Sequence, residues 1–154
     1  MPLSDAEKAL RLGALGENLY ANIKNNAGCN VQLSLDPYDF TRDMLVDDKT
    51  IEIKTQMLMH SIGRFTINKN QAKKCAGVDI LVMIETPHIE SGDVVRIYEF
   101  MAGRDSFSLN TTYIGGLHKY TIDPSRGKLI CEIQDPYILN LMKKYSTSAY
   151  KRFS

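Results

Sequence analysis

Residues 78–85 read Val-Asp-Ile-Leu-Val-Met-Ile-Glu, an almost continuous apolar segment rich in β-branched side chains. A strand of this kind has no polar face, so other parts of the chain must cover both of its sides. The segment therefore predicts a buried central strand with a packed layer on each side. Just before it, Asn68 can cap a helix that Gly77 ends. A helix between two strands is typical of the crossover connection of an α/β sheet.

The remaining patterns fit one α/β domain. Ser4-Asp5-Ala6-Glu7 is a capping box that predicts a helix from about residue 5 to about residue 25. Asp135-Pro136 is a typical start for a final helix. We predict a mixed central sheet of about five strands flanked by helices. The core covers residues 4–102, and C-terminal strands and a helix cover 103–154. Further strands are predicted over residues 29–35, 64–67, 94–102 and 129–133, with a second hairpin over 111–122.

Two smaller expectations concern which side chains are buried. In the predicted strand 29–35, Val31, Leu33 and Leu35 alternate with polar residues, so they are expected to face the core. Asp79 and Glu85 lie at the two ends of the apolar segment and are expected to face solvent.

Composition limits the class of protein. The chain of 154 residues is 44% hydrophobic and 24% charged, which is typical of a single soluble domain. No apolar run approaches the roughly 18 residues of a membrane span, and no signal peptide is evident, so we expect an intracellular protein, cytoplasmic or nucleoplasmic. The cysteines (Cys29, Cys75 and Cys131) are widely spaced and are expected to be reduced thiols. A net charge of +1 restricts any nucleic-acid binding to a local patch.

A candidate site lies in residues 42–55. Two β-prone segments, 42–46 and 49–55, flank the polar pair Asp47-Asp48, which predicts a hairpin with a two-residue loop. In that register Val46 faces Lys49, Met44 faces Ile51, and Asp43 faces Glu52. Alternation then places residues 43, 52 and 54 on one face and residues 44, 51 and 53 on the other.

Two opposed acids predict a cation. Directly opposed side chains lie roughly 4.5–5.5 Å apart at Cβ, where like charges repel. Mg²⁺, which prefers octahedral oxygen ligation, suits such a pair, and Lys54 completes a site that can activate water beside a phosphate. The alternative interpretation is an ordinary solvated face of a hairpin.

These residues also resemble a known family. Asp43, an eight-residue gap and then Glu52-Ile53-Lys54 resemble the PD-(D/E)xK nuclease superfamily, which has the restriction-endonuclease-like fold; the resemblance spans roughly residues 13–85. It implies that Asp43, Glu52 and the carbonyl of Ile53 bind the metal, that Lys54 lies beside the attacking water, and that Glu17 is a further acid. Arg42 stands where the family name has proline, and Asp39 is a rival to Asp43 as the metal-binding acid.

The resemblance extends to substrate contacts. It implies that Gln71, on the helix after the E-x-K strand, borders the active site and binds a phosphate or the metal-bound water. We expect the surrounding lysines Lys69, Lys73 and Lys74 to contact a nucleic-acid backbone. Lys143 and Lys144 begin a C-terminal segment without acids, which either binds phosphates or is a solvated terminus.

The sequence thus predicts a metal-dependent deoxyribonuclease that uses Mg²⁺, with Mn²⁺ as a substitute. An endonuclease acting on duplex or structured DNA is favoured over an exonuclease, and RNA remains open as a substrate. By analogy we expect a homodimer and no membrane partner. The alternatives are a non-catalytic nucleic-acid-binding or assembly module that keeps the nuclease fold, and an unrelated α/β domain. No paired Cys/His spacing predicts a zinc site, although His60 lies where it could approach a substrate.

Overall fold

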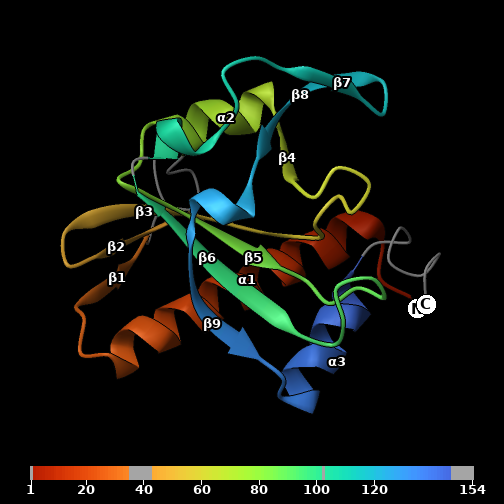
Figure 1. The fold of residues 1–154 in the computed structure, drawn as a ribbon. Helices are drawn as coiled ribbons and strands as arrows, with labels where there is room; N and C mark the ends of the chain where they lie inside the picture. The colour runs from red at the N-terminus through yellow and green to blue at the C-terminus, as the bar shows by residue number, and fades with distance from the viewer. Residues whose placement is uncertain (1, 35–42, 102, 147–154) are drawn as a thin grey trace.

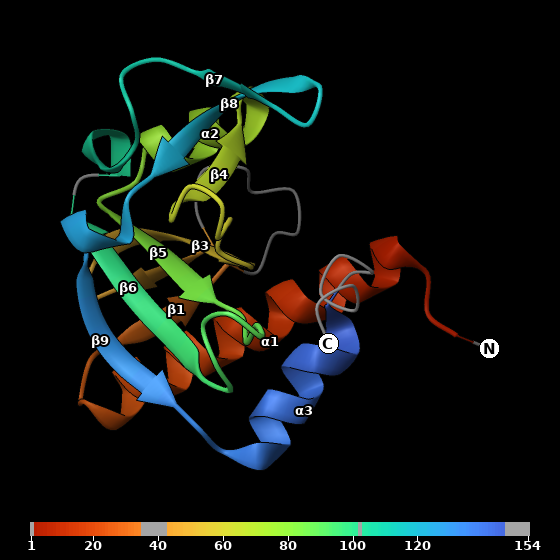
Figure 2. The same cartoon turned by 45° about the vertical axis from the view of Figure 1, so that its right-hand side comes forward.

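A computed structural model describes residues 2–34, 43–101 and 103–146. Its centre is a six-stranded mixed sheet in the order β1-β2-β3-β5-β6-β9, and a second sheet has the order β4-β8-β7. Helices α1 and α3 cover one face of the large sheet, while α2 and the small sheet lie on the other (Figures 1 and 2). The α/β class and the mixed sheet are confirmed, whereas the large sheet has six strands and a separate small sheet was not predicted.

The first half of the chain contains α1 (Asp5–Asn26), β1 (Val31–Leu33), β2 (Met44–Val46), β3 (Lys49–Gln56), β4 (Phe65–Asn68), α2 (Lys69–Ala76) and β5 (Ile80–Glu85). The second half contains β6 (Val95–Met101), the short 3₁₀ helices η1 (Gly103–Ser106) and η2 (Pro124–Arg126), β7 (Thr112–Ile114), β8 (Leu117–Ile122), β9 (Lys128–Ile133) and α3 (Pro136–Tyr145).

Strand β5 is the central strand that its apolar sequence predicts. It pairs in parallel with β3 and antiparallel with β6, and every one of its residues is buried. Its side chains alternate between two cores. Ile80, Val82 and Ile84 pack toward α1 and α3, while Leu81 and Met83 pack toward α2 and the small sheet. The two cores explain why this strand has no polar face.

Helix α1 is fixed to the sheet by a close approach and by a buried polar contact. A Cβ added to Gly16 would lie 1.9 Å from Thr55 Oγ1, so only glycine permits this separation. The buried Tyr20 hydroxyl donates to Glu99 Oε2 at 2.5 Å, and Lys24 Nζ lies 2.9 Å from the same oxygen. Burial and the hydrogen bond to Glu99 raise the pKa of Tyr20, which therefore remains a donor across the physiological range.

Two predicted burial patterns are wrong. Glu85 is 2% exposed rather than solvated, because its partner across the ladder is Arg96, whose Nη1 lies 3.7 Å from Glu85 Oε1. Leu33 is 52% exposed rather than in the core, because β1 is the edge strand of the sheet. Leu35 lies outside the described residues, and Asp79 is exposed as expected.

Within the described residues, no helix is both long enough and apolar enough to cross a membrane.

Candidate active site

The hairpin of β2 and β3 has the register that its sequence predicts. Val46 pairs with Lys49, Leu45 with Thr50, and Met44 with Ile51. Asp47 and Asp48 have φ angles of 48° and 65°, the positive values that a type I′ two-residue turn requires. Because Met44 and Ile51 are fully buried against the α1 layer, alternation turns Glu52 toward the α2 layer.

Asp43 reaches the site by a different route from the one expected. The β2–β3 ladder ends at Met44 and Ile51, and the N–H of Asp43 donates to the Ile51 carbonyl at 2.8 Å instead of forming the next rung. Its carboxylate Oδ2 accepts the N–H of Ile53 at 2.7 Å. The bond to the β3 backbone thus holds Asp43 beside Glu52, without the direct 43–52 strand pair.

Two lysines face this pair of acids. Lys74, on α2, places Nζ 3.2 Å from Asp43 Oδ1 and 3.3 Å from Glu52 Oε2. Lys54, two residues beyond Glu52 on the same face of β3, places Nζ 3.8 Å from Glu52 Oε1. The sequence predicted Lys74 only as a contact to a nucleic-acid backbone, and its position between the two acids was not predicted. From the sequence, the N-cap at Asn68 and the helical repeat predict that Lys74 and Asn70 lie on the same side of α2. They do not predict which side of α2 faces the acids.

Burial and charge make Glu52 a weak acid. It is 1% exposed. Burial, a hydrogen bond with Asp43 and repulsion by Asp43 raise its pKa to about 8, against the opposing effect of Lys54 and Lys74. For Lys74, burial acts to lower the pKa, but attraction by Asp43 and Glu52 outweighs it and the pKa is raised. The acid pair therefore retains a proton or a cation near neutral pH.

The donor set fits a hard divalent ion. Glu52 Oε2 is buried and accepts no hydrogen bond within the described residues, although Lys74 lies near it. The N–H of Ile53 points toward Asp43, and the carbonyl of the same strand residue points to the same side. Two carboxylates and a backbone carbonyl are the oxygen ligands that Mg²⁺ prefers.

Glu17 lies in the same electrostatic environment. Burial raises its pKa, as does the charge of Asp43, while Lys74 and Lys54 lower it. This third acid, on α1, is therefore close enough to Asp43 for their charges to interact. Asp39, the rival metal ligand, lies outside the described residues.

A depression beside the acids is lined by Lys54, Asn70, Gln71, Lys73 and Lys74. Gln71 lines this depression, and its side-chain carbonyl accepts the N–H of Asn68 at 3.2 Å in a capping box. Only the amide NH₂ of Gln71 therefore remains to bind a phosphate. Lys69 is exposed at the start of α2.

Lys143 and Lys144 are not part of this site. Both lie on α3, whose apolar side packs in the core on the α1 face of the sheet, opposite Lys74. Lys143 Nζ pairs with Asp93 Oδ1 at 2.6 Å, and Lys144 lies 5.7 Å from the centre of the Tyr145 ring. The expected phosphate contacts at these residues therefore cannot share a face with Asp43 and Glu52.

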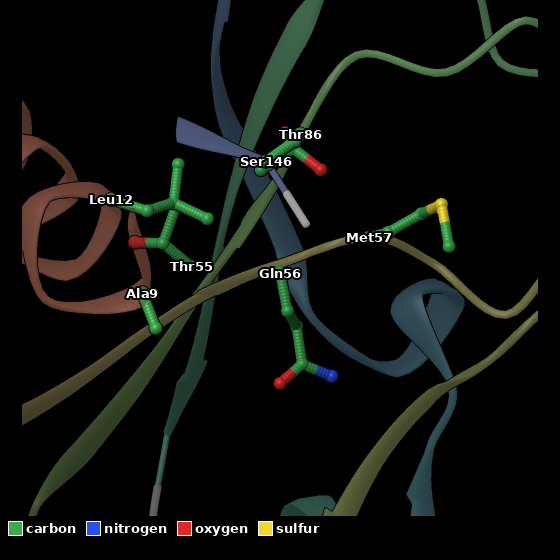
Figure 3. A pocket seen from close by; sticks show the side chains of 7 residues that line it. All are labelled: Ala9, Leu12, Thr55, Gln56, Met57, Thr86 and Ser146. Carbon is green, nitrogen blue, oxygen red and sulfur yellow. The ribbon is translucent and has the colours of Figure 1, made fainter. Parts of the chain in front are cut away.

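Among the residues that the structure describes, one pocket and the buried thiol of Cys75 provide no group that could act as an acid, a base or a nucleophile at neutral pH. The pocket of about 190 Å³ between α1 and the ends of β3 and β5 is lined by residues without ionisable side chains (Figure 3). The Gln56 side chain turns away from Leu12 and Thr55, and its amide donates to the Thr66 carbonyl at 2.8 Å (Figure 3).

Burial raises the pKa of Cys75 to about 12, so this thiol is not a nucleophile at neutral pH. All three cysteines are free, as predicted.

No family model matches the chain, and no curated protein or solved structure matches it.

Proposed function

We propose that this protein is a Mg²⁺-dependent nuclease of the PD-(D/E)xK type that hydrolyses phosphodiester bonds in DNA, and that its mixed sheet is a variant of the restriction-endonuclease-like fold. The observation that carries the proposal is that the Asp43 carboxylate is held beside Glu52 of β3, with Lys54 Nζ 3.8 Å from Glu52. A buried acid in contact with a second acid destabilises a protein unless the pair binds a cation, and the adjacent lysine suits a phosphate.

Asp43, Glu52 and the Ile53 carbonyl would hold the ion, with Glu17 completing its shell directly or through water. When bound, Mg²⁺ or Mn²⁺ supplies a Lewis acid that polarises a phosphate and lowers the pKa of water. Lys54 orients the attacking water and donates hydrogen bonds to the phosphate oxygens as negative charge grows on them. Lys74 exchanges its carboxylate partners for a substrate phosphate, and the Gln71 amide donates to the same group.

The substrate contacts are local, as the near-neutral net charge requires. Lys54, Lys73 and Lys74 line one depression beside the acids, and Lys69 extends this positive surface along α2. Such a surface suits the phosphates of a nucleic-acid backbone. We propose that the substrate is duplex or structured DNA and that the protein is an endonuclease that works as a homodimer. Cleavage of RNA is tested alongside DNA.

The test compares two lysines of the same strand. Lys54→Ala should reduce Mg²⁺-dependent cleavage of plasmid by about 100-fold or more, while its circular dichroism spectrum and DNA binding change little. Lys49→Ala is the matched control, because Lys49 is exposed at the start of β3. A Lys54→Ala protein as active as wild type would refute the assigned role.

A second candidate function rests on Lys74. Because its ammonium already pairs with both acids at 3.2 and 3.3 Å, the chain could keep the fold as a non-catalytic nucleic-acid-binding or assembly module. Calorimetric titration with Mg²⁺ separates the two functions. The nuclease binds the ion in wild type and loses binding in Asp43→Asn, whereas the module binds no ion at this site and cuts no DNA.

A further inference from the structure

A second group of metal-ligating side chains lies at the C-terminal ends of β3 and β5. These strands are parallel neighbours whose last paired residues are Gln56 and Glu85, so their following loops leave the same edge of the sheet. One loop is closed by a bridge between Met59 and Arg64, and the other by a bridge between His88 and Gly92. The carboxyl ends of parallel strands are a common location for ligand sites in α/β sheets.

The two loops bring His60, His88 and Glu90 together. The imidazole rings stack with centroids 4.4 Å apart and planes at 22°. His60 Nδ1 lies 3.7 Å from Glu90 Oε2, and one ligand atom from each of the three residues lies within 4.8 Å of the other two. Ligands bound at roughly 2.0–2.2 Å to a tetrahedral ion are separated by roughly 3.3–3.6 Å. The three atoms therefore need to move only modestly to share one ion.

The chemistry of the cluster selects the ion. Two imidazoles and a carboxylate are ligands for Zn²⁺ and related transition-metal ions, whereas Mg²⁺ favours oxygen alone. His60 Nε2 is buried without a hydrogen-bond partner within the described residues. His88 Nδ1 accepts the N–H of Glu90 at 3.0 Å, and a metal ion bound at this nitrogen would replace that hydrogen bond.

We propose that His60, His88 and Glu90 bind a divalent transition-metal ion of the Zn²⁺ class, which ties the loop after β3 to the loop after β5. Three protein ligands leave a fourth position for water or a ligand. The same residues line a cavity of about 480 Å³ together with Met57, Met59 and Thr66, so this position is accessible. The site shares no ligand with Asp43 and Glu52, and it stands or falls independently of the proposed nuclease activity.

Calorimetric titration of chelator-treated full-length protein with ZnCl₂, in buffer containing excess Mg²⁺, tests the proposal. Wild type should bind one Zn²⁺ per chain, and its melting temperature should rise with Zn²⁺. His60→Gln and Glu90→Gln should each weaken binding at least tenfold and abolish the thermal shift. Glu90 is 57% exposed, so its variant should fold even if a variant of His60 does not.

His118→Gln is the matched control, because His118 is exposed on β8 and its ring lies 5.2 Å from that of Tyr113. Titration with Co²⁺ adds a second readout, since a tetrahedral site gives an intense visible spectrum. Absence of saturable one-to-one binding would overturn the proposal. Equal weakening by His118→Gln, or unchanged binding in the folded Glu90→Gln protein, would overturn it as well.

Discussion

The ammonium group of Lys74 pairs with both carboxylates of the candidate active site, so it competes with any divalent ion for them. Its removal should therefore affect ion binding and folding in opposite directions. We expect Lys74→Met to tighten Mg²⁺ binding about tenfold, or ~1.4 kcal/mol. The same change should destabilise the metal-free protein by about 1–3 kcal/mol, because two acids lose their shared partner.

Calorimetry and urea unfolding measure these two effects of Lys74→Met, and Lys69→Met is the control on the same helix. Unchanged Mg²⁺ affinity would show that the ammonium group and the ion do not use the same carboxylates.

Glu52 should make the metal-free protein sensitive to pH. Its pKa is raised to about 8 in the folded protein, chiefly by burial, from 4.5 in the unfolded chain. A raised pKa contributes stability that is fully present below pH 4.5 and is lost as pH rises through about 8. We expect this loss to be on the order of a few kcal/mol, reinforced by Glu17, whose pKa is also raised.

Urea unfolding in the presence of chelator, at several pH values across that window, measures the slope. Glu52→Gln should flatten it and should make the metal-free protein more stable at pH 8 than wild type. An identical slope in wild type and variant would show that Glu52 is not the responsible group.

At the scale of the elements, α1 contains two glycines that should respond in opposite ways to alanine. A Cβ at Gly13 meets nothing within 4 Å, so Gly13→Ala should stabilise the helix by about 0.5–1 kcal/mol. A Cβ at Gly16 would collide with Thr55, so Gly16→Ala should destabilise by about 1–3 kcal/mol. Thermal unfolding of both variants measures the difference, and a stabilising Gly16→Ala would show that α1 does not approach β3 so closely.

The β2–β3 turn provides a second matched pair. Asp47 and Asp48 both have positive φ, which glycine adopts without strain. Asp48→Gly should therefore stabilise the protein by up to about 1 kcal/mol. Asp47→Gly should gain less or lose stability, because Asp47 Oδ1 accepts the N–H of Asn30 at 2.8 Å. Denaturant unfolding would contradict this account of the turn if the two variants changed stability equally.

The elements also show how far sequence reasoning reaches. The β2–β3 register was predictable because a two-residue loop leaves the strands one in-register pairing, and alternation then assigns Glu52 and Lys54 to one face. The position of Lys74 was not, because helical spacing does not show which side of α2 faces β3. Glu85 is buried through its partner Arg96 on another strand, a contact that local hydrophobicity does not encode.

The cluster of His60, His88 and Glu90 was also not predictable from local sequence patterns. Its residues are 28 and 2 positions apart along the chain, a spacing that matches no zinc motif. They meet because β3 and β5 are adjacent, parallel and end at the same level. Both strands were predicted, so the missing information was their pairing. A search for ligands just beyond the ends of two predicted parallel strands would have found this cluster.

At the scale of the whole molecule, most of the candidate active site lies on one side of the large sheet. The α1 and α3 layer provides one apolar core and carries Glu17, while Lys74 on α2 and Lys54 on β3 face the acids from the other side (Figure 1). Substrate DNA should therefore approach on the α2 side, at the depression beside the acids, and leave the α3 surface uncovered. Lys143 and Lys144 should accordingly contribute little to DNA affinity, because they lie on the other face.

The proposed nuclease activity is tested by cleavage of a panel of single-stranded, duplex, nicked, flapped and four-way DNA, with an RNA duplex alongside. Wild type and Glu52→Gln are compared with Mg²⁺ and with chelator. We predict that wild type cuts at least one DNA only when the ion is present, and that Glu52→Gln cleaves about 1,000-fold or more slowly. Contradiction would come from a wild type that cuts nothing with Mg²⁺ or Mn²⁺, or from a Glu52→Gln protein that cuts as fast as wild type.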